Sequence, residues 1–354
     1  MLVAHLVSLL KWILGGTVQV RRVIQELEMR KPELKRIVAA LRQLSPVQRK
    51  VVAVELAALE TQTMATVIVE GRFASGAMCL HCKSSHVVRH GHANGLQRYR
   101  CRECRKTFSA LTGTSLNGLH KRGKWLEQAR ALMDGQPLRK VARNLNIHLS
   151  TAHRWRHHFL AAPQAIQPHA LTGIAEADET FFLLSFKGQR SGLARPARKR
   201  GGKAAARGLS HEQVPVLVAR DRSGATMDCV LNATTGTSLS DALKPYVALD
   251  VVLCTDGSKA FASAARKLGV EHHAVNLSAG IRVDGAWHVQ NVNAYQREAY
   301  PEGYSRLKAW IYKFRGVATR YLANYLGWFR ALERDPTGGP KPQDWLAMTF
   351  ASAT

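Results

Sequence analysis

Residues 174–182 read IAEADETFF, and this stretch indicates how the second half of the chain folds. Apolar residues alternate around Asp178, a pattern typical of a β-strand. A second strand over residues 250–254 is followed by Asp256, where a helix begins. From residue 173 onward, strand-like runs (174–182, 214–220, 250–254) alternate with helix-like runs (240–247, 258–268). This alternation predicts a mixed α/β domain.

Asp178 and Asp256 stand out because the chain has only 25 acidic residues against 51 lysines and arginines. Carboxylates at the ends of neighbouring strands can hold two Mg²⁺ ions roughly 4 Å apart, one activating the attacking oxygen and one the leaving oxygen of a phosphodiester. The alternatives are a turn or helix-cap role for Asp256 and a structural hydrogen bond for Asp178. These residues by themselves leave both interpretations open.

The chain of 354 residues is long enough for two or three domains. Its formal net charge of +26 predicts a polyanionic partner, and nucleic acid fits best. A hydrophobic content of 46% separates it from disordered basic tails. The apolar residues 1–14 are interrupted by polar ones, so we expect an amphipathic helix, with a secretion signal as the alternative. We expect no stretch long enough to span a membrane, and no membrane partner.

Helical periodicity predicts two helices over residues 20–62, so residues 1–70 form a helical N-terminal extension. The second helix begins at SPVQ, where Ser45 can cap the helix and Gln48 can bond back to it. At the other end, residues 334–354 contain three prolines and two glycines. We expect a frayed or lightly docked tail there.

Four cysteines in residues 75–122 form a metal-binding pattern. They are paired as two CxxC motifs with eighteen residues between the pairs: Cys79, Cys82, Cys101 and Cys104. This spacing predicts one structural Zn²⁺ ion in a zinc ribbon whose small sheet folds on metal binding. Free thiolates indicate a reducing cytoplasm. Cys229 and Cys254 lie outside the pattern, and we expect them to be small buried apolar residues.

Residues 123–162 predict a helix-turn-helix, with Ser150 placed to cap the second helix. We expect Arg154 and Arg156 to face the major groove of DNA. The core face of this helix is predicted from its apolar residues: Ala152, Trp155 and Phe159. A plain helical hairpin has the same apolar pattern, but residues 83–156 carry sixteen lysines and arginines against three acids, which favours DNA binding.

A second basic run lies between residues 187 and 207, with eight basic residues, four glycines and no acid. We expect a flexible loop that follows the phosphate backbone of DNA, with Lys199 and Arg200 among its contacts. The alternative is a solvated loop without a partner.

The motifs of residues 75–333 resemble, in order, those of a known family. DETFF from Asp178, the basic loop, VPVLVARDRSG, TDGSKAF, GAWHVQNVNAY and SRLKAWIYKFRGVATRYLANYLGW are similar to insertion-sequence transposases of the DDE superfamily, in the ISXO-type branch that carries an N-terminal zinc ribbon. The resemblance implies an RNase H-like catalytic domain over residues 170–333 with two Mg²⁺ or Mn²⁺ ions. By motif position, Asp178 and Asp256 are the first two catalytic carboxylates and bind these ions.

The third catalytic position departs from the family's glutamate. His288 is followed, five residues on, by Asn293, and members of the branch with asparagine there belong to the pattern. An amide oxygen can bind Mg²⁺ but brings no charge, so we expect lower metal affinity. Lys308 matches a supporting basic residue, but residues 296–304 lengthen the spacing before it. Either this copy is damaged, or the insertion loops out and the helix resumes; two residues of the insertion are possible substitute ligands: Glu298 and Glu302.

The resemblance implies a multi-domain protein of α and α/β parts that acts as a DNA transposase. It would bind the ends of an insertion sequence, cleave them and transfer a 3′-hydroxyl into target DNA, as a homo-oligomer on double-stranded DNA in the bacterial cytoplasm, at the nucleoid. Two alternatives remain. One is an impaired copy that only binds DNA, as a repressor or domesticated factor, and the other is a metal-dependent nuclease that does not join strands.

Overall fold

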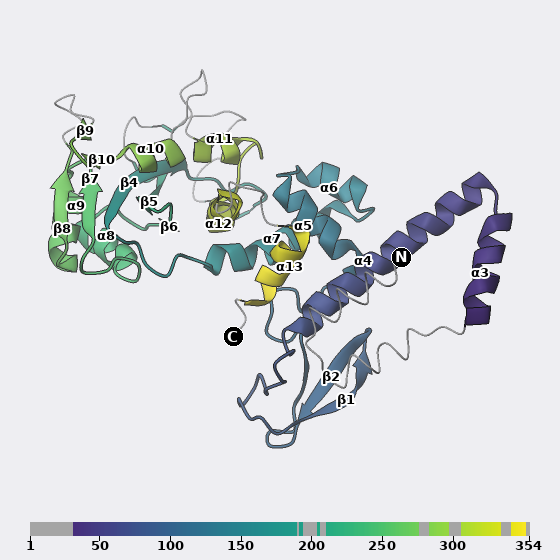
Figure 1. The fold of residues 1–354 in the computed structure, drawn as a ribbon. Helices are drawn as coiled ribbons and strands as arrows, with labels where there is room; N and C mark the ends of the chain where they lie inside the picture. The colour runs from purple at the N-terminus through teal and green to yellow at the C-terminus, as the bar shows by residue number, and fades with distance from the viewer. Residues whose placement is uncertain are drawn as a thin grey trace. The chain divides into compact units, whose positions relative to one another are not determined.

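The computed structural model describes residues 31–189, 191–193, 204–205, 210–275, 283–296, 306–333 and 341–351. The chain divides into two compact units, residues 1–60 and 61–354. The first contains helix α3 (Lys31–Gln43) and the start of α4 (Pro46–Gly71) (Figure 1). The predicted capping of α4 is confirmed: the Ser45 N–H donates to Gln48 Oε1 at 2.9 Å, and the Gln48 N–H donates to Ser45 Oγ at 3.3 Å. The helix expected over residues 1–14 lies outside the described residues.

Helix α4 is long and apolar for a helix that is largely exposed. Within the described ranges it is the one helix that could cross a membrane by length and composition, with a mean hydropathy of 1.4 over a window that is 6% buried. The expectation that no stretch has this length was therefore wrong, because alanines and valines dominate its 26 residues. Glu55 and Glu60 lie in this helix, and carboxylates in hydrocarbon are costly. Length and composition thus do not by themselves make α4 a membrane span.

The cysteine-rich region folds as a small antiparallel sheet. Its strands lie in the order β1 (Val87–Ala93), β2 (Leu96–Cys101) and β3 (Thr107–Ser109). Asn94 and Gly95 both have positive φ in the hairpin turn between β1 and β2, as tight two-residue turns require. Tyr99 stacks on Phe108 with ring centroids 5.7 Å apart. Such a small apolar group leaves most of the stabilisation to the cysteines.

Three helices follow, after a 3-10 turn at Arg122–Lys124: α5 (Trp125–Met133), α6 (Leu138–Asn144) and α7 (Leu149–Ala165). The predicted core face of α7 is confirmed, because Ala152, Trp155 and Phe159 are buried. The cap differs from the prediction: His148 precedes α7, and its Nδ1 accepts the Ser150 N–H at 3.3 Å. The helix begins two residues earlier than expected, so Ser150 lies within the first turn.

A five-stranded mixed sheet forms the centre of the C-terminal half. In spatial order its strands are β6 (Thr226–Val230), β5 (Gln213–Asp221), β4 (Ile174–Leu183), β7 (Val252–Thr255) and β8 (Glu271–Ala274). Strand β5 is antiparallel to β4 and β6, whereas β7 is parallel to β4 and β8. This order and these directions are those of an RNase H-like sheet, as the resemblance implied.

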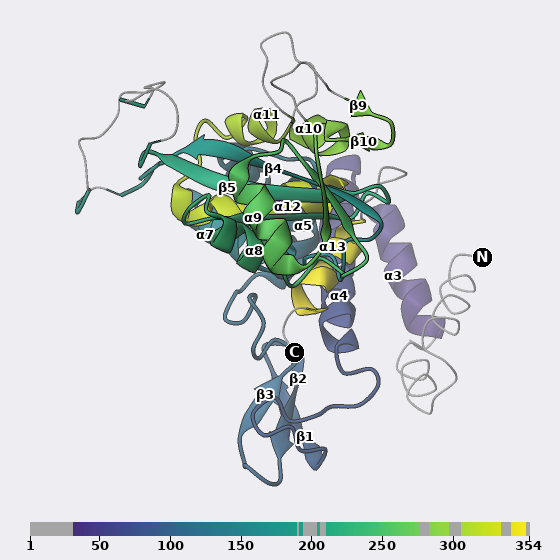
Figure 2. The same cartoon turned by 90° about the vertical axis from the view of Figure 1, so that its left-hand side faces the viewer.

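Helices cover both faces of this sheet (Figure 2). On one face lie α8 (Gly236–Leu243) and α9 (Lys259–Leu268), packed on alternate residues of β4 and β5. The other face contacts the helices that follow the short hairpin β9 (Val283–Asp284) and β10 (Trp287–His288). These are α10 (Gln290–Gln296), α11 (Arg306–Tyr312) and, after a 3-10 turn at Thr319–Tyr321, α12 (Leu322–Glu333).

The C-terminal segment is docked, which corrects the expectation of a frayed tail. Helix α13 (Pro342–Ala351) packs on α5 and α7. Trp345 and Leu346 are fully buried, and Phe350 nearly so. A frayed tail was expected because of the prolines and glycines, but these residues lie before α13 and at its first position. The apolar residues beyond them complete the core around α5 and α7.

Candidate active site and nucleic-acid interface

Strands β4 and β7 bring the two predicted aspartates to the same level. Residues 174, 175 and 176 pair with residues 252, 253 and 254, so residue 178 is level with residue 256, one residue beyond β7. Neighbouring strands lie about 4.8 Å apart. Asp178 is half-buried and Asp256 is exposed. The Ser258 N–H donates to Asp256 Oδ1 at 3.0 Å, which orients this carboxylate at the start of α9.

Glu179 adds a third carboxylate to this edge of the sheet. Its N–H donates to Asp178 Oδ1 at 2.9 Å. Burial, and then the charges of Asp178 and Asp256, raise the pKa of Glu179 from 4.5 to about 7. Carboxylate oxygens are the ligands that Mg²⁺ and Mn²⁺ prefer, so Asp178 and Asp256 offer the type of donor that the implied metal ions require. Among the described residues, the preformed cluster of three or more ligand side chains is that of the four cysteines.

Helix α10 carries Asn293 and is attached to the sheet through buried Glu176 of β4. The Val292 N–H donates to Glu176 Oε2 at 2.9 Å, and Asn291 Nδ2 donates to Glu176 Oε1 at 3.1 Å. His288 Nδ1 lies 3.2 Å from Glu176 Oε1. Asn293 itself is half-buried. The predicted site residues His288 and Asn293 thus lie on either side of Asn291 and Val292, which bond to the strand that carries Asp178.

Lys308 lies on α11, which contacts α10. Its side chain is half-buried. Helix α10 is described as far as Gln296 and α11 from Arg306. The residues between them, which hold most of the insertion, lie outside the described residues, so both outcomes that the sequence left open stay predictions. The possible substitute ligands Glu298 and Glu302 lie outside the described residues.

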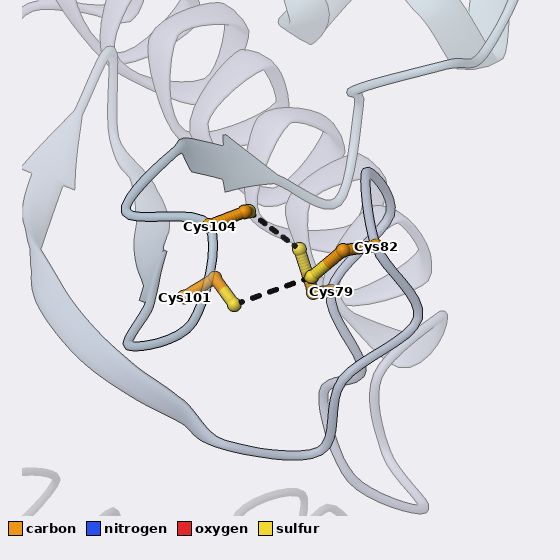
Figure 3. Close-up of side chains that lie close together, drawn as sticks. All are labelled: Cys79, Cys82, Cys101 and Cys104. Atoms are coloured by element: carbon orange, nitrogen blue, oxygen red, sulfur yellow. Dashed lines mark hydrogen bonds between the residues drawn. The ribbon is translucent and has the colours of Figure 1, made fainter.

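The four predicted zinc ligands converge at one point (Figure 3). All four sulfurs lie within 4.8 Å of one another, and the Cys79–Cys104 and Cys82–Cys101 pairs are each 3.6 Å apart. Tetrahedral Zn–S bonds of about 2.3 Å place sulfurs about 3.8 Å apart, so the cluster fits one Zn²⁺ ion. Burial raises the pKa of the Cys79 thiol, but hydrogen bonds from the backbone N–H groups of Cys82 and His81 and from the Cys82 and Cys104 side chains together outweigh it and lower this pKa from 9.0 to about 6. Of the other cysteines, Cys254 is buried and Cys229 half-buried.

The two arginines predicted to face DNA have different surroundings. Arg154 is exposed on α7, as expected. Arg156 is only 1% exposed, so its prediction as a DNA contact was wrong. Its guanidinium lies 5.1 Å from the Trp328 ring centroid and 5.5 Å from that of Phe314. It occupies the core stripe of α7, one turn beyond Ala152.

Other basic side chains gather between the small sheet and the first turn of the helical region. A cavity of about 470 Å³ is lined there by residues that include Arg98, Lys121 and Arg122. Arg139 and Lys140 are exposed on α6. Lys199 and Arg200 lie outside the described residues. The described surface thus presents basic residues from both the small sheet and the helices.

Known protein families match both the helix-turn-helix region and the domain that contains the five-stranded sheet. The ISXO2-like transposase domain family matches residues 170–330, and the homeodomain-like helix-turn-helix family matches residues 120–164. Residues 170–330 are an ISXO2-like transposase domain. An uncharacterized protein in transposable element ISH50 of Halobacterium salinarum is 26% identical over 270 residues, covering 75% of this chain and 88% of that protein.

Two solved structures align with much of the chain at low similarity. The simian T-cell lymphotropic virus intasome in complex with PP2A regulatory subunit B56 gamma gives a TM-score of 0.26 at 12% identity, covering 60% of this chain and 77% of the other. The pre-cleavage Mos1 transpososome gives 0.17 at 14% identity, covering 65% and 79%. The family assignment rests on the sequence matches and on the sheet itself.

The transposase domain contains three polar residues whose roles the sequence did not reveal: Glu176, Glu179 and Arg222. Arg222 Nη2 lies 3.2 Å from Glu176 Oε1, and Arg222 Nη1 contacts His288 Nε2. A signal for Glu176 was present, because it stands two residues before Asp178 in a strand and therefore points to the same face. No comparable periodicity marks Arg222, which follows the end of β5.

Proposed function

We propose that this protein is a DNA transposase that binds the ends of an insertion sequence, cleaves DNA strands there and joins them to target DNA. The observation that carries the proposal is the level placement of Asp178 on β4 and of Asp256 one residue beyond β7, the neighbouring parallel strand. The match of residues 170–330 to the transposase family supports the same reaction class, polynucleotidyl transfer.

Asp178 and Asp256 would hold the divalent ions, with Asn293 offering an amide oxygen. When bound, the two ions activate the attacking oxygen and stabilise the leaving oxygen of the phosphodiester. Glu179 carries a proton up to about neutral pH in the metal-free site, so it becomes an additional anion as pH rises. Lys308 would meet DNA phosphate from α11, because a cationic side chain is the natural partner of that charge.

DNA recognition would combine the zinc-binding sheet with the helix-turn-helix. Arg154 on the exposed side of α7 can contact base edges or phosphate. The basic cavity beside Lys121 can contact the DNA backbone and fix the register of the protein on the duplex. Two copies acting on two element ends would complete the assembly.

The test uses the full-length, zinc-loaded protein with element-end DNA, a target plasmid and Mg²⁺ or Mn²⁺. Joined products are expected. Asp178→Ala and Asp256→Ala should abolish joining while sparing binding to the ends, and Asp241→Ala, an exposed aspartate on α8, is the matched control that should join normally. Nicks without joining would instead support a nuclease. A mobility shift with neither product would support a protein that only binds DNA.

A further inference from the structure

Glu176 is a fully buried carboxylate at the centre of the transposase domain. It stands two residues before Asp178, on the same face of β4, the face that α10 covers. A buried charge is costly unless other groups pair with it and donate hydrogen bonds to it. Its surroundings therefore show which parts of the fold depend on it.

Both oxygens of Glu176 contact elements that follow it by many residues. Oε2 accepts the backbone N–H of Val292, in the first turn of α10, at 2.9 Å. Oε1 accepts from Asn291 Nδ2 at 3.1 Å and lies 3.2 Å from Arg222 Nη2. A carboxylate at this place satisfies an N–H that has no partner within the helix and interacts favourably with the helix dipole. Glu176 thus caps α10 from the sheet.

Arg222 and His288 complete the attachment. Arg222 Nη1 contacts His288 Nε2, and Arg222 Nη2 donates to the Ala286 carbonyl at 3.0 Å. His288 Nδ1 lies 3.2 Å from Glu176 Oε1 and 3.2 Å from the backbone nitrogen of Gln290, the first residue of α10. The hairpin before α10 and the first turn of α10 are therefore both bonded to one strand residue.

We infer that Glu176 is a positioning residue that sets α10, and with it Asn293, against Asp178 and Asp256. Asn293 follows Val292 directly, so the bond from Val292 to Glu176 fixes the backbone next to the third position of the site. The attachment compensates for a third ligand that brings no charge of its own, because a neutral amide binds a cation well only when it is held in place. The effect on catalysis rests on the proposed function, whereas the anchoring of α10 does not.

Glu176→Gln in the full-length protein tests this inference. The glutamine oxygen can replace one accepting oxygen, but its amide N–H₂ then faces donors of Arg222 or Asn291. Hydrogen–deuterium exchange of residues 288–296 should become faster. In the variant, α10 lacks its hydrogen bonds to the carboxylate, so less free energy is needed to open the helix locally. The Mn²⁺ concentration for half-maximal strand cleavage should rise about 10- to 100-fold. Binding to element ends should be unchanged.

Asp221→Asn is the matched control. Asp221 is a buried carboxylate of the same sheet, but it accepts from Thr172 and Ala225, at 3.0 Å and 2.9 Å, and not from α10. This control should lower the midpoint of thermal unfolding without accelerating exchange in α10. Arg222→Lys, a milder change at a partly exposed position, should accelerate it less than Glu176→Gln.

Wild-type exchange of α10 in folded Glu176→Gln protein, or equal acceleration in Asp221→Asn, would overturn the inference. Accelerated exchange with an unchanged Mn²⁺ requirement would refute the link to Asn293. If the wild-type protein neither cleaves nor joins DNA, the proposed function fails, and the exchange data still decide whether Glu176 anchors α10.

Discussion

Replacing Arg156 by alanine is expected to destabilise the fold, although this residue was predicted from the sequence to bind DNA. The guanidinium is buried and contacts two aromatic rings, those of Trp328 and Phe314. It also donates to the Gln136 carbonyl and lies 3.5 Å from the Tyr325 hydroxyl. Burial lowers the pKa of Arg156, since the charged form loses its hydration.

The magnitude follows from these contacts. A hydrogen bond from a charged donor contributes about 1.5–3 kcal/mol, and a desolvated cation over aromatic rings about 2 kcal/mol. Releasing the buried charge offsets part of this loss. We expect Arg156→Ala to lower the free energy of unfolding by about 2–4 kcal/mol, which for a chain of 354 residues corresponds to a fall of roughly 3–5 °C in the midpoint of thermal unfolding.

Arg154→Ala is the matched comparison, because it lies two residues earlier on the same helix and is exposed. It should leave the midpoint within a degree or so, since surface changes are usually within about 0.5 kcal/mol. If it contacts phosphate, the slope of log affinity against log salt should fall by about 0.9. Thermal unfolding and salt-dependent mobility shifts on element-end DNA measure both effects. The reasoning fails if Arg156→Ala retains wild-type stability and loses DNA affinity.

Three further predictions concern other parts of the fold. Gly327→Ala should lower the free energy of unfolding in urea by about 1–3 kcal/mol, because an added Cβ would lie 2.5 Å from Gln164 Cα, and unchanged stability would contradict this close approach. Removing Zn²⁺ with a chelator should increase hydrogen exchange across the small sheet and weaken end binding, so indifference to the chelator would exclude a structural zinc ion. Burial, and then the charge of His153, lower the pKa of His157 from 6.5 to about 3. Between pH 6.5 and pH 3 the unfolded protein therefore binds a proton at His157 that the folded protein does not bind, so the free energy of unfolding falls as the pH falls through this range. His157→Gln should lose less stability on acidification than the wild-type protein, and identical pH profiles of the two proteins would contradict this.

Local patterns predicted the elements that depend on nearby residues. The capping of α4 by Ser45 and Gln48, the two CxxC motifs and the strand around Asp178 were all visible, because spacing and residue type fix them within a few positions. Even the position of Asp256 beyond its strand was predicted. Its level with Asp178 was not, since strand register depends on pairing between distant segments.

The errors have a common physical cause, which is tertiary contact across long separations in sequence. Arg156 was predicted to bind DNA because of its charge, but its partners Phe314 and Trp328 lie far along the chain. The C-terminal segment was predicted to be frayed because of its prolines, whereas Trp345 is buried against helices that precede it by about two hundred residues. Arg222 gave no local signal, because its role depends on Glu176 and a hairpin far from it. Sequence patterns therefore predict the presence and the apolar face of a helix or strand more reliably than they predict which distant segments pack against it.

Helix α7 has a consequence for exchanging parts between proteins of this kind. Arg154 lies in its first half and Gln164, which meets Gly327 of α12, lies near its end, so ten residues of one helix, about 15 Å along its axis, separate these two points. Each residue added or removed between them would turn Arg154 by about 100° around the helix axis relative to the sheet and shift it by about 1.5 Å. A chimera that joins a foreign helix-turn-helix within α7 must therefore preserve the residue count between these two points.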